Sequence, residues 1–245
     1  NTFTRTGYTF LGWSTDPETT SATYTNGQSV SNLTSEDGGV VNLYAVWKIN
    51  TYTVSVVVNN GTTSPATRTV NYNTNATFTL NPNTGYESPT VSCTNSQKAS
   101  ISGTTLTISN VTSNTTCTVT YKPTTYTITY NLGGGSVTGN PSSYTVESNA
   151  ITLKNPSKTG YTFTGWTGSN GSTAQTTVTI PKGSTGNKSY TANYRANTYE
   201  VKYNSNGGSG TMSNSSHTYG VSKALSSNTF TRTGYTFLGW STDPE

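Results

Sequence analysis

Two cysteines, Cys93 and Cys117, are the only thiol-bearing residues of this 245-residue sequence. Such a pair can form a disulfide, share a metal ion with other ligands, or stay reduced in a protein interior. A metal site needs further ligands, and the single histidine, His217, lies far away in the sequence. We therefore expect a structural disulfide between Cys93 and Cys117, which by the chain-entropy model stabilises a fold by about 3 kcal/mol. A pair of buried thiols is the alternative.

Tryptophans recur along the chain at places where strands are expected. A flat indole ring can bind the apolar face of a sugar, or it can fill a hydrophobic core. Because few other large apolar side chains surround these rings, core packing is the better interpretation, and it extends to the tyrosines that open the predicted strands. The predicted core aromatic residues are Trp13, Trp47, Trp166, Trp240, Tyr52, Tyr126 and Tyr199.

Acidic residues and histidine are too scarce to suggest catalysis. Nine Asp and Glu residues and one His form no Ser/His/Asp, Cys/His or paired-carboxylate arrangement that repeats along the chain. The acidic residues Asp16, Glu18, Glu36 and Asp37 lack the ordered ligand loop of a calcium site. Glycine-rich segments fit hairpin turns better than phosphate-binding loops. We therefore predict no enzyme activity, no metal site and no cofactor, while a Lys–Asn isopeptide crosslink stays open.

The composition indicates the fold class. The chain contains 55 Thr, 32 Ser and 27 Asn, so nearly half of it consists of short polar side chains that favour strands and turns. Only 29% of the residues are hydrophobic, which favours several small cores over one large core. The net charge of +4 comes from scattered basic residues. We therefore expect an all-β protein that binds no nucleic acid and makes no membrane contact within these residues.

The most informative feature is repetition. Residues 1–18 and 228–245 are identical, which defines a long period of 227 residues. Identity over eighteen residues indicates a recent tandem duplication, so we expect the 227-residue super-repeat to continue on both sides of residues 1–245. A shorter repeat is marked by Thr-Gly-Tyr, whose tyrosines follow one another at intervals of 78, 75 and 74 residues.

The short repeat divides the chain into modules. Each module is expected to begin with an opening strand, such as TYTITYNLGGG from residue 125, and to end with a closing strand, such as YTANYR at 190–195. A second strand and a Gly-Tyr strand are expected between them. The predicted segments are the C-terminal half of a module at 1–48, a module with the cysteine pair at 49–122, a module at 123–195, and the N-terminal half of a module at 196–245.

Two segments carry a family resemblance. The run RTGYTFLGWSTDP at 5–17, followed by LYAVWK at 43–48, resembles the Listeria/Bacteroides repeat, also known as the internalin B-repeat. KTGYTFTGW at 158–166 is similar to it, whereas the module at 49–122 departs from it because NTGYESPTVSC lacks the Gly-Trp pair. The resemblance implies small β-grasp-like modules in long, secreted, cell-surface proteins of bacteria, and it implies no catalytic residues.

A mechanical role makes the best use of tightly joined, charge-poor β-modules. We expect a tandem array of β-rich repeats that forms an elongated rod, in an extracellular fibre, filament or stalk at the cell surface. The expected partners are adjacent copies of the same repeat, in the same chain or in neighbouring chains. The alternative is an adhesin whose repeats bind host or environmental glycans or proteins directly.

Overall fold

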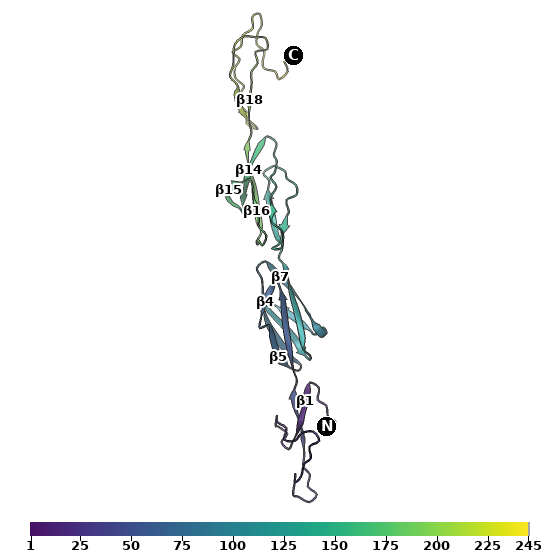
Figure 1. Ribbon diagram of the computed structural model, residues 1–245. Coiled ribbons are helices and arrows are strands. Elements are labelled where there is room, and N and C mark those ends of the chain that lie inside the picture. Colours follow the sequence, from purple (N-terminus) through teal and green to yellow (C-terminus); the bar gives the residue numbers. More distant parts are fainter. Residues whose placement is uncertain (245) are drawn as a thin grey trace. The chain divides into compact units, whose positions relative to one another are not determined.

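The computed structural model describes residues 1–244, and these residues form strands joined by turns (Figure 1). The short 3-10 helix η1, Thr94–Ser96, is the one helical element in the described residues. The expected all-β class is therefore confirmed, in keeping with the stiff, β-branched threonines that favour extended backbone. The chain forms two compact units, Asn1–Thr124 and a second from Thr125 onward, and each is described by itself.

The first unit begins with a two-stranded antiparallel sheet. Its strands are β1 (Tyr8–Ser14) and β2 (Tyr44–Ile49), with Trp13 opposite Ala45. The connection between them, residues 15–43, carries no strand and is mostly exposed. Among residues 1–244 no second layer of strands packs on this sheet, so few of its residues are buried.

The rest of the first unit is a sandwich of two four-stranded sheets. One sheet has the order β5-β3-β10-β7, and the other has the order β4-β6-β9-β8. The strands of the first sheet are β3 (Thr51–Asn59), β5 (Thr67–Asn71), β7 (Tyr86–Cys93) and β10 (Thr115–Pro123). Those of the second are β4 (Gly61–Ser64), β6 (Thr74–Pro82), β8 (Ala99–Ser102) and β9 (Thr105–Val111). All pairs are antiparallel except β3 with β10.

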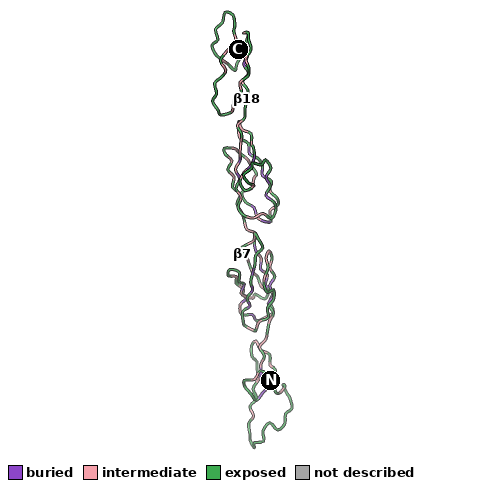
Figure 2. The backbone as a smooth tube through the Cα atoms, turned by 90° about the vertical axis from the view of Figure 1, so that its left-hand side faces the viewer, coloured by how far each residue is buried: buried purple, intermediate pink, exposed green. Residues whose placement is uncertain are grey.

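The core of this sandwich lies between the two sheets. Alternate residues are buried in β3, β6 and β10, which is the period of two expected for a strand with one buried face (purple in Figure 2). Burying a Leu or Phe side chain fully stabilises a fold by about 1.5–3 kcal/mol. The buried residues are Val54, Val56, Ala76, Phe78, Leu80, Leu106, Ile108, Val111, Cys117, Val119 and Tyr121.

The second unit contains a five-stranded sheet in the order β12-β11-β17-β14-β15, together with a two-stranded sheet, β13-β16. Its central strands are β11 (Tyr126–Asn131), β14 (Tyr161–Gly168) and β17 (Lys188–Ala196). The shorter strands are β12 (Ser143–Tyr144), β13 (Ile151–Thr152), β15 (Gly171–Gln175) and β16 (Thr179–Ile180). The buried residues gather around Trp166 and are Ile128, Tyr144, Leu153, Trp166, Val178, Ile180, Tyr190 and Ala192.

The second unit ends in a small antiparallel pair, β18 (Thr198–Val201) with β19 (Ser215–Thr218). Residues 228–244 contain no strand, although the identical segment near the start of the chain contains β1. Backbone N–H and C=O groups form a strand only where a partner accepts and donates hydrogen bonds. Residues 8–14 have that partner in β2, whereas the described residues pair with 228–244 only at an isolated bridge between Ser209 and Thr231.

The two sandwich-like bodies share one plan. In each, the opening strand pairs in parallel with the closing strand, β3 with β10 and β11 with β17. The Gly-Tyr strand, β7 or β14, pairs antiparallel on the other side of the closing strand. In residues 51–123 strands rather than a helix form the layer packed on this mixed sheet, and the β-grasp likeness implied by the resemblance stays a prediction.

Candidate functional site

Cys93 and Cys117 form a disulfide, as predicted. The two residues are directly opposite each other on β7 and β10, with their Cα atoms 4.0 Å apart. Between them the chain leaves the first sheet, forms β8 and β9 in the second sheet, and returns. The bond therefore closes a loop that joins both layers of the sandwich, and a loop of 24 residues corresponds to about 3 kcal/mol of loop-closure entropy.

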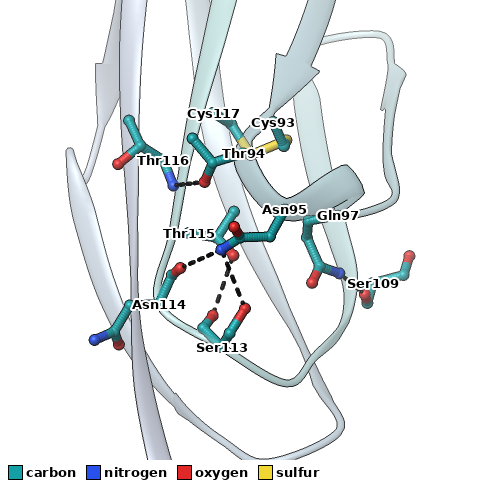
Figure 3. Close-up of a disulfide and its surroundings, with 10 residues drawn as sticks. All are labelled: Cys93, Thr94, Asn95, Gln97, Ser109, Ser113, Asn114, Thr115, Thr116 and Cys117. Carbon is teal, nitrogen blue, oxygen red and sulfur yellow. Dashed lines mark hydrogen bonds between the residues drawn. A yellow bond between two sulfur atoms is a disulfide. The ribbon is translucent and has the colours of Figure 1, made fainter.

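Side-chain hydrogen bonds hold the turns beside the disulfide (Figure 3). The Thr94 hydroxyl accepts from the backbone N–H of Thr116 at 3.0 Å, and the Asn95 amide donates to the carbonyl oxygen of Asn114 at 3.1 Å. Asn95 has a φ of +56°, a left-handed conformation that asparagine tolerates better than most residues. These bonds satisfy backbone groups where both sheets end, so they support the disulfide rather than offer a ligand site.

Trp166 is fully buried in the second unit. Its ring centroid lies 5.5 Å from that of Phe163 and 5.9 Å from that of Tyr130, and its indole N–H donates to the side-chain oxygen of Asn155 at 3.1 Å. Burial, with a smaller contribution from Tyr190, raises the pKa of Tyr130 to about 12. A ring enclosed on all sides cannot bind a sugar.

The other three tryptophans keep part of their surface exposed. Trp13 and Trp47 lie on β1 and β2, where both rings contact Phe10 edge-on at 5.2 and 5.5 Å. Trp240 packs 4.8 Å from Tyr203 in the last segment. These three rings form small aromatic clusters that are partly buried.

The opening tyrosines divide in the same way. Tyr52 and Tyr126 are half-buried against the cores of their sandwiches. Tyr199 is 50% exposed, so the prediction that it is a core residue is wrong. No closing strand lies beside β18 in the described residues, and the Tyr199 ring instead stacks on His217 with centroids 5.5 Å apart.

His217 belongs to a partly buried chain of hydrogen-bonded polar side chains that sequence reasoning missed. Its Nε2 lies 2.8 Å from the Ser215 hydroxyl, which lies 2.8 Å from the Tyr203 hydroxyl. The backbone N–H of Ser226 donates to the same Tyr203 oxygen at 2.7 Å. Hydrogen bonds with Ser215 and Ser226 lower the pKa of Tyr203. The polar sequence of β19 does not predict that His217 is buried, although its side chain is only 4% exposed.

A hollow of about 1000 Å³, the C-terminal hollow, lies beside Tyr203. It is lined by aromatic and polar side chains of residues 201–244, among them Tyr203, Phe230, Arg232, Phe237 and Trp240. Residues 1–244 contain no group of three or more His, Cys, Asp or Glu side chains placed to hold a metal ion. Within the described residues, no helix has the length and apolar character needed to cross a membrane.

Comparisons with known families match most of the chain. Residues 126–198 match the divergent InlB B-repeat domain. Residues 1–46 and 199–245 match the Listeria-Bacteroides repeat domain, and two of these ranges begin at the opening tyrosines Tyr126 and Tyr199. Neither of these two domain families matches residues 47–125, the part of the chain that holds the disulfide and lacks the Gly-Trp pair. No curated protein and no solved structure matches the chain.

Proposed function

Because the chain belongs to the Listeria-Bacteroides repeat family and includes a divergent InlB B-repeat domain, we propose that it is the structural repeat region of a long, secreted bacterial surface protein. In this role it forms an extracellular fibre, filament or stalk, whose partners are adjacent copies of the same repeat. Repeats of this family are structural modules of bacterial surface proteins, and the proposed role requires neither a catalytic residue nor a cofactor.

The observation that carries this proposal is the parallel pairing of the first and last strands of each sandwich. The chain enters the first sandwich at Thr51, at the start of β3, and leaves it at Pro123, at the end of β10. Residues 54–59 of β3 lie in parallel register with residues 115–120 of β10. In the second unit, residues 128–131 pair in the same way with residues 188–191.

This pairing suits a chain under tension. Pulling on the two chain ends of such a body slides β3 along β10, so the hydrogen bonds between the strands are loaded together rather than one after another. An antiparallel hairpin pulled at its open end separates one bond at a time. A module joined to its neighbours through the ends of two parallel strands therefore has a high kinetic barrier to forced unfolding.

The disulfide supports an extracellular setting. Disulfides persist in oxidising environments such as the cell surface and are rare in the cytosol. Cys93 and Cys117 are bonded in the part of the chain that departs most from the family pattern. There the covalent bond compensates for the missing Gly-Trp pair of a small core.

Single-molecule pulling tests the proposal. We expect the force that unfolds residues 51–123 to be several times higher when the chain is pulled through its two ends than when handles at Thr51 and Asn71 pull apart β3 and β5. The second geometry is the matched control, because Thr51 and Asn71 are opposite each other in an antiparallel pair. Equal unfolding forces in the two geometries would contradict a load-bearing role.

An adhesin is the second candidate, and the C-terminal hollow is the observation in its favour. Its partly exposed Trp240 ring and neighbouring Tyr203 and Arg232 offer stacking and hydrogen-bonding groups of the kind that bind sugars. A glycan array probed with the full chain distinguishes the two roles. Dose-dependent binding that Trp240→Ala abolishes and Trp47→Ala preserves would favour the adhesin, and no binding to any glycan would favour the stalk.

A further inference from the structure

A single asparagine connects two successive segments at the start of β3. The backbone N–H of Asn50 donates to the carbonyl oxygen of Gly7 at 2.8 Å, and its own carbonyl oxygen accepts from the N–H of Tyr72 at 2.8 Å. Its side-chain oxygen accepts from the Thr9 hydroxyl at 2.6 Å. Asn50 therefore ties the Gly-Tyr-Thr turn that leads into β1 to the residue that follows β5.

The same three bonds recur in the second unit. The N–H of Asn197 donates to the carbonyl oxygen of Gly160 at 2.9 Å, and the N–H of Tyr219 donates to the carbonyl oxygen of Asn197 at 2.8 Å. The Thr162 hydroxyl donates to the side-chain oxygen of Asn197 at 2.7 Å. Two junctions far apart in the sequence thus share one geometry built from the same residue types.

The glycine and the tyrosine of each junction also pack directly together. A Cβ added to Gly7 would overlap the Tyr72 ring, and one added to Gly160 would overlap the Tyr219 ring. Both glycines have positive φ, +79° and +78°. Only glycine allows a ring to lie this close to the backbone, so the residue types at both positions are determined by the contact.

We propose that these residues form an inter-module clasp, a docking surface by which the Gly-Tyr-Thr turn of one module recognises the Asn and Tyr of the next and holds the two in one orientation. The clasp consists of Gly7, Thr9, Asn50 and Tyr72 at one junction and of Gly160, Thr162, Asn197 and Tyr219 at the other. The inference goes beyond the proposed function, because it holds whether the chain serves as a stalk or as an adhesin.

A third junction between successive modules lies at Thr124, and its residues differ from those of the clasp. Thr124 replaces the clasp asparagine, and Glu87 replaces the clasp threonine after the Gly-Tyr pair. Strand register places Val146 where the other junctions have Tyr72 and Tyr219, two residues after the partner of the opening tyrosine. Of the three clasp bonds, Thr124 retains the one from its backbone N–H to the carbonyl oxygen of Gly85, at 2.8 Å. The residue types of the clasp are therefore absent at these three positions of the sequence.

Distance distributions between nitroxide labels test the clasp in the full chain. The labels go on the exposed residues Ser172 and Ser222, attached through unnatural amino acids so that the disulfide stays intact. We expect Gly160→Ala to broaden the distribution at least twofold, and Thr162→Val to broaden it by a smaller factor. Gly183→Ala is the matched control, since Gly183 has a φ of +82° but nothing within 4 Å of an added Cβ.

The circular dichroism spectrum of each variant establishes that the sandwiches stay folded. Broadening by Gly160→Ala and Thr162→Val, with a wild-type distribution for Gly183→Ala, would support the clasp. If both clasp variants are folded and keep the wild-type width, or if Gly183→Ala broadens the distribution as much as Gly160→Ala does, the proposal is overturned.

Discussion

Trp13 and Trp240 occupy the same position in two identical eighteen-residue segments, yet only Trp13 lies on a paired strand, opposite Ala45. Both rings keep the same edge-on phenylalanine neighbour, Phe10 at 5.2 Å for Trp13 and Phe237 at 4.9 Å for Trp240. The aromatic cluster is thus a local property of the sequence. The strand is not local, because it depends on a partner elsewhere in the chain.

Replacing Trp166 tests whether its role is structural. Trp166→Ala removes a fully buried ring, so we expect it to lower the free energy of unfolding of residues 125–196 by about 3–5 kcal/mol. Trp47→Ala replaces a partly exposed ring of β2, so it should lower the free energy of unfolding of its own segment by less than about 2 kcal/mol. Hydrogen exchange resolved by segment measures both effects. A Trp166→Ala chain with unchanged exchange rates would show that the ring is not part of the core.

Tyr130 makes the free energy of unfolding of the second unit depend on pH in the alkaline range. Its pKa is raised from 10.0 in the unfolded chain to about 12 in the fold, chiefly by burial, and its hydroxyl donates to the carbonyl oxygen of Pro141 at 2.9 Å. A folded-state pKa above the unfolded value favours the neutral, folded form, so this stabilisation is fully present below pH 10 and is lost as the pH rises toward 12.

Urea denaturation of the second unit between pH 8 and pH 12 measures this dependence. We expect stability to fall over that range in the wild type and to fall less steeply in Tyr130→Phe. Tyr199→Phe serves as the control, since the Tyr199 ring is 50% exposed. If the slope of Tyr130→Phe matches that of the wild type, Tyr130 is not responsible for the pH dependence.

Much of the molecule follows from sequence pattern, for identifiable reasons. Period-two alternation predicted the strands that bear the two cores, because a sheet with one buried face imposes that period. The disulfide was predictable because Cys93 and Cys117 had no other partner, and strand pairing places them opposite each other. Local features of this kind require only neighbouring residues or a single pair.

Features that depend on several distant segments were not predictable from the same patterns. Tyr199 resembles Tyr52 and Tyr126 in sequence, but its burial depends on a closing strand that no described residue provides. Asn50 and Asn197 are two among 27 asparagines, and only their three-dimensional contacts distinguish them. A signal did exist, since each follows a closing strand directly and precedes Thr-Tyr.

Removing the Ser215 hydroxyl tests the partly buried chain of hydrogen bonds between Tyr203 and His217. Ser215→Ala removes the hydroxyl that lies between the Tyr203 hydroxyl and His217 Nε2. The Tyr203 oxygen keeps the Ser226 N–H, but His217 Nε2 loses this partner, and a buried polar group without a partner costs about 1–3 kcal/mol. We expect faster exchange of the Ser226 amide, which donates to Tyr203. Ser216→Ala, next along the strand but exposed, should leave that amide unchanged. Equal exchange rates of the Ser226 amide in the two variants would mean that the hydrogen bonds of Ser215 contribute nothing to local stability.

The disulfide predicts a length that single-molecule pulling can measure. Cys93 and Cys117 are separated by 24 residues, which the bond withholds from extension when the first sandwich unfolds. At about 3.3–3.6 Å per extended residue, reduction should therefore lengthen the unfolded first sandwich by about 80 Å. The unfolding step of the second unit, which contains no cysteine, should be the same length under both conditions and serves as the internal control. An equal first-sandwich step in oxidised and reduced chains would mean that the bond does not form in solution, and the covalent support proposed for this part of a load-bearing stalk would then be absent.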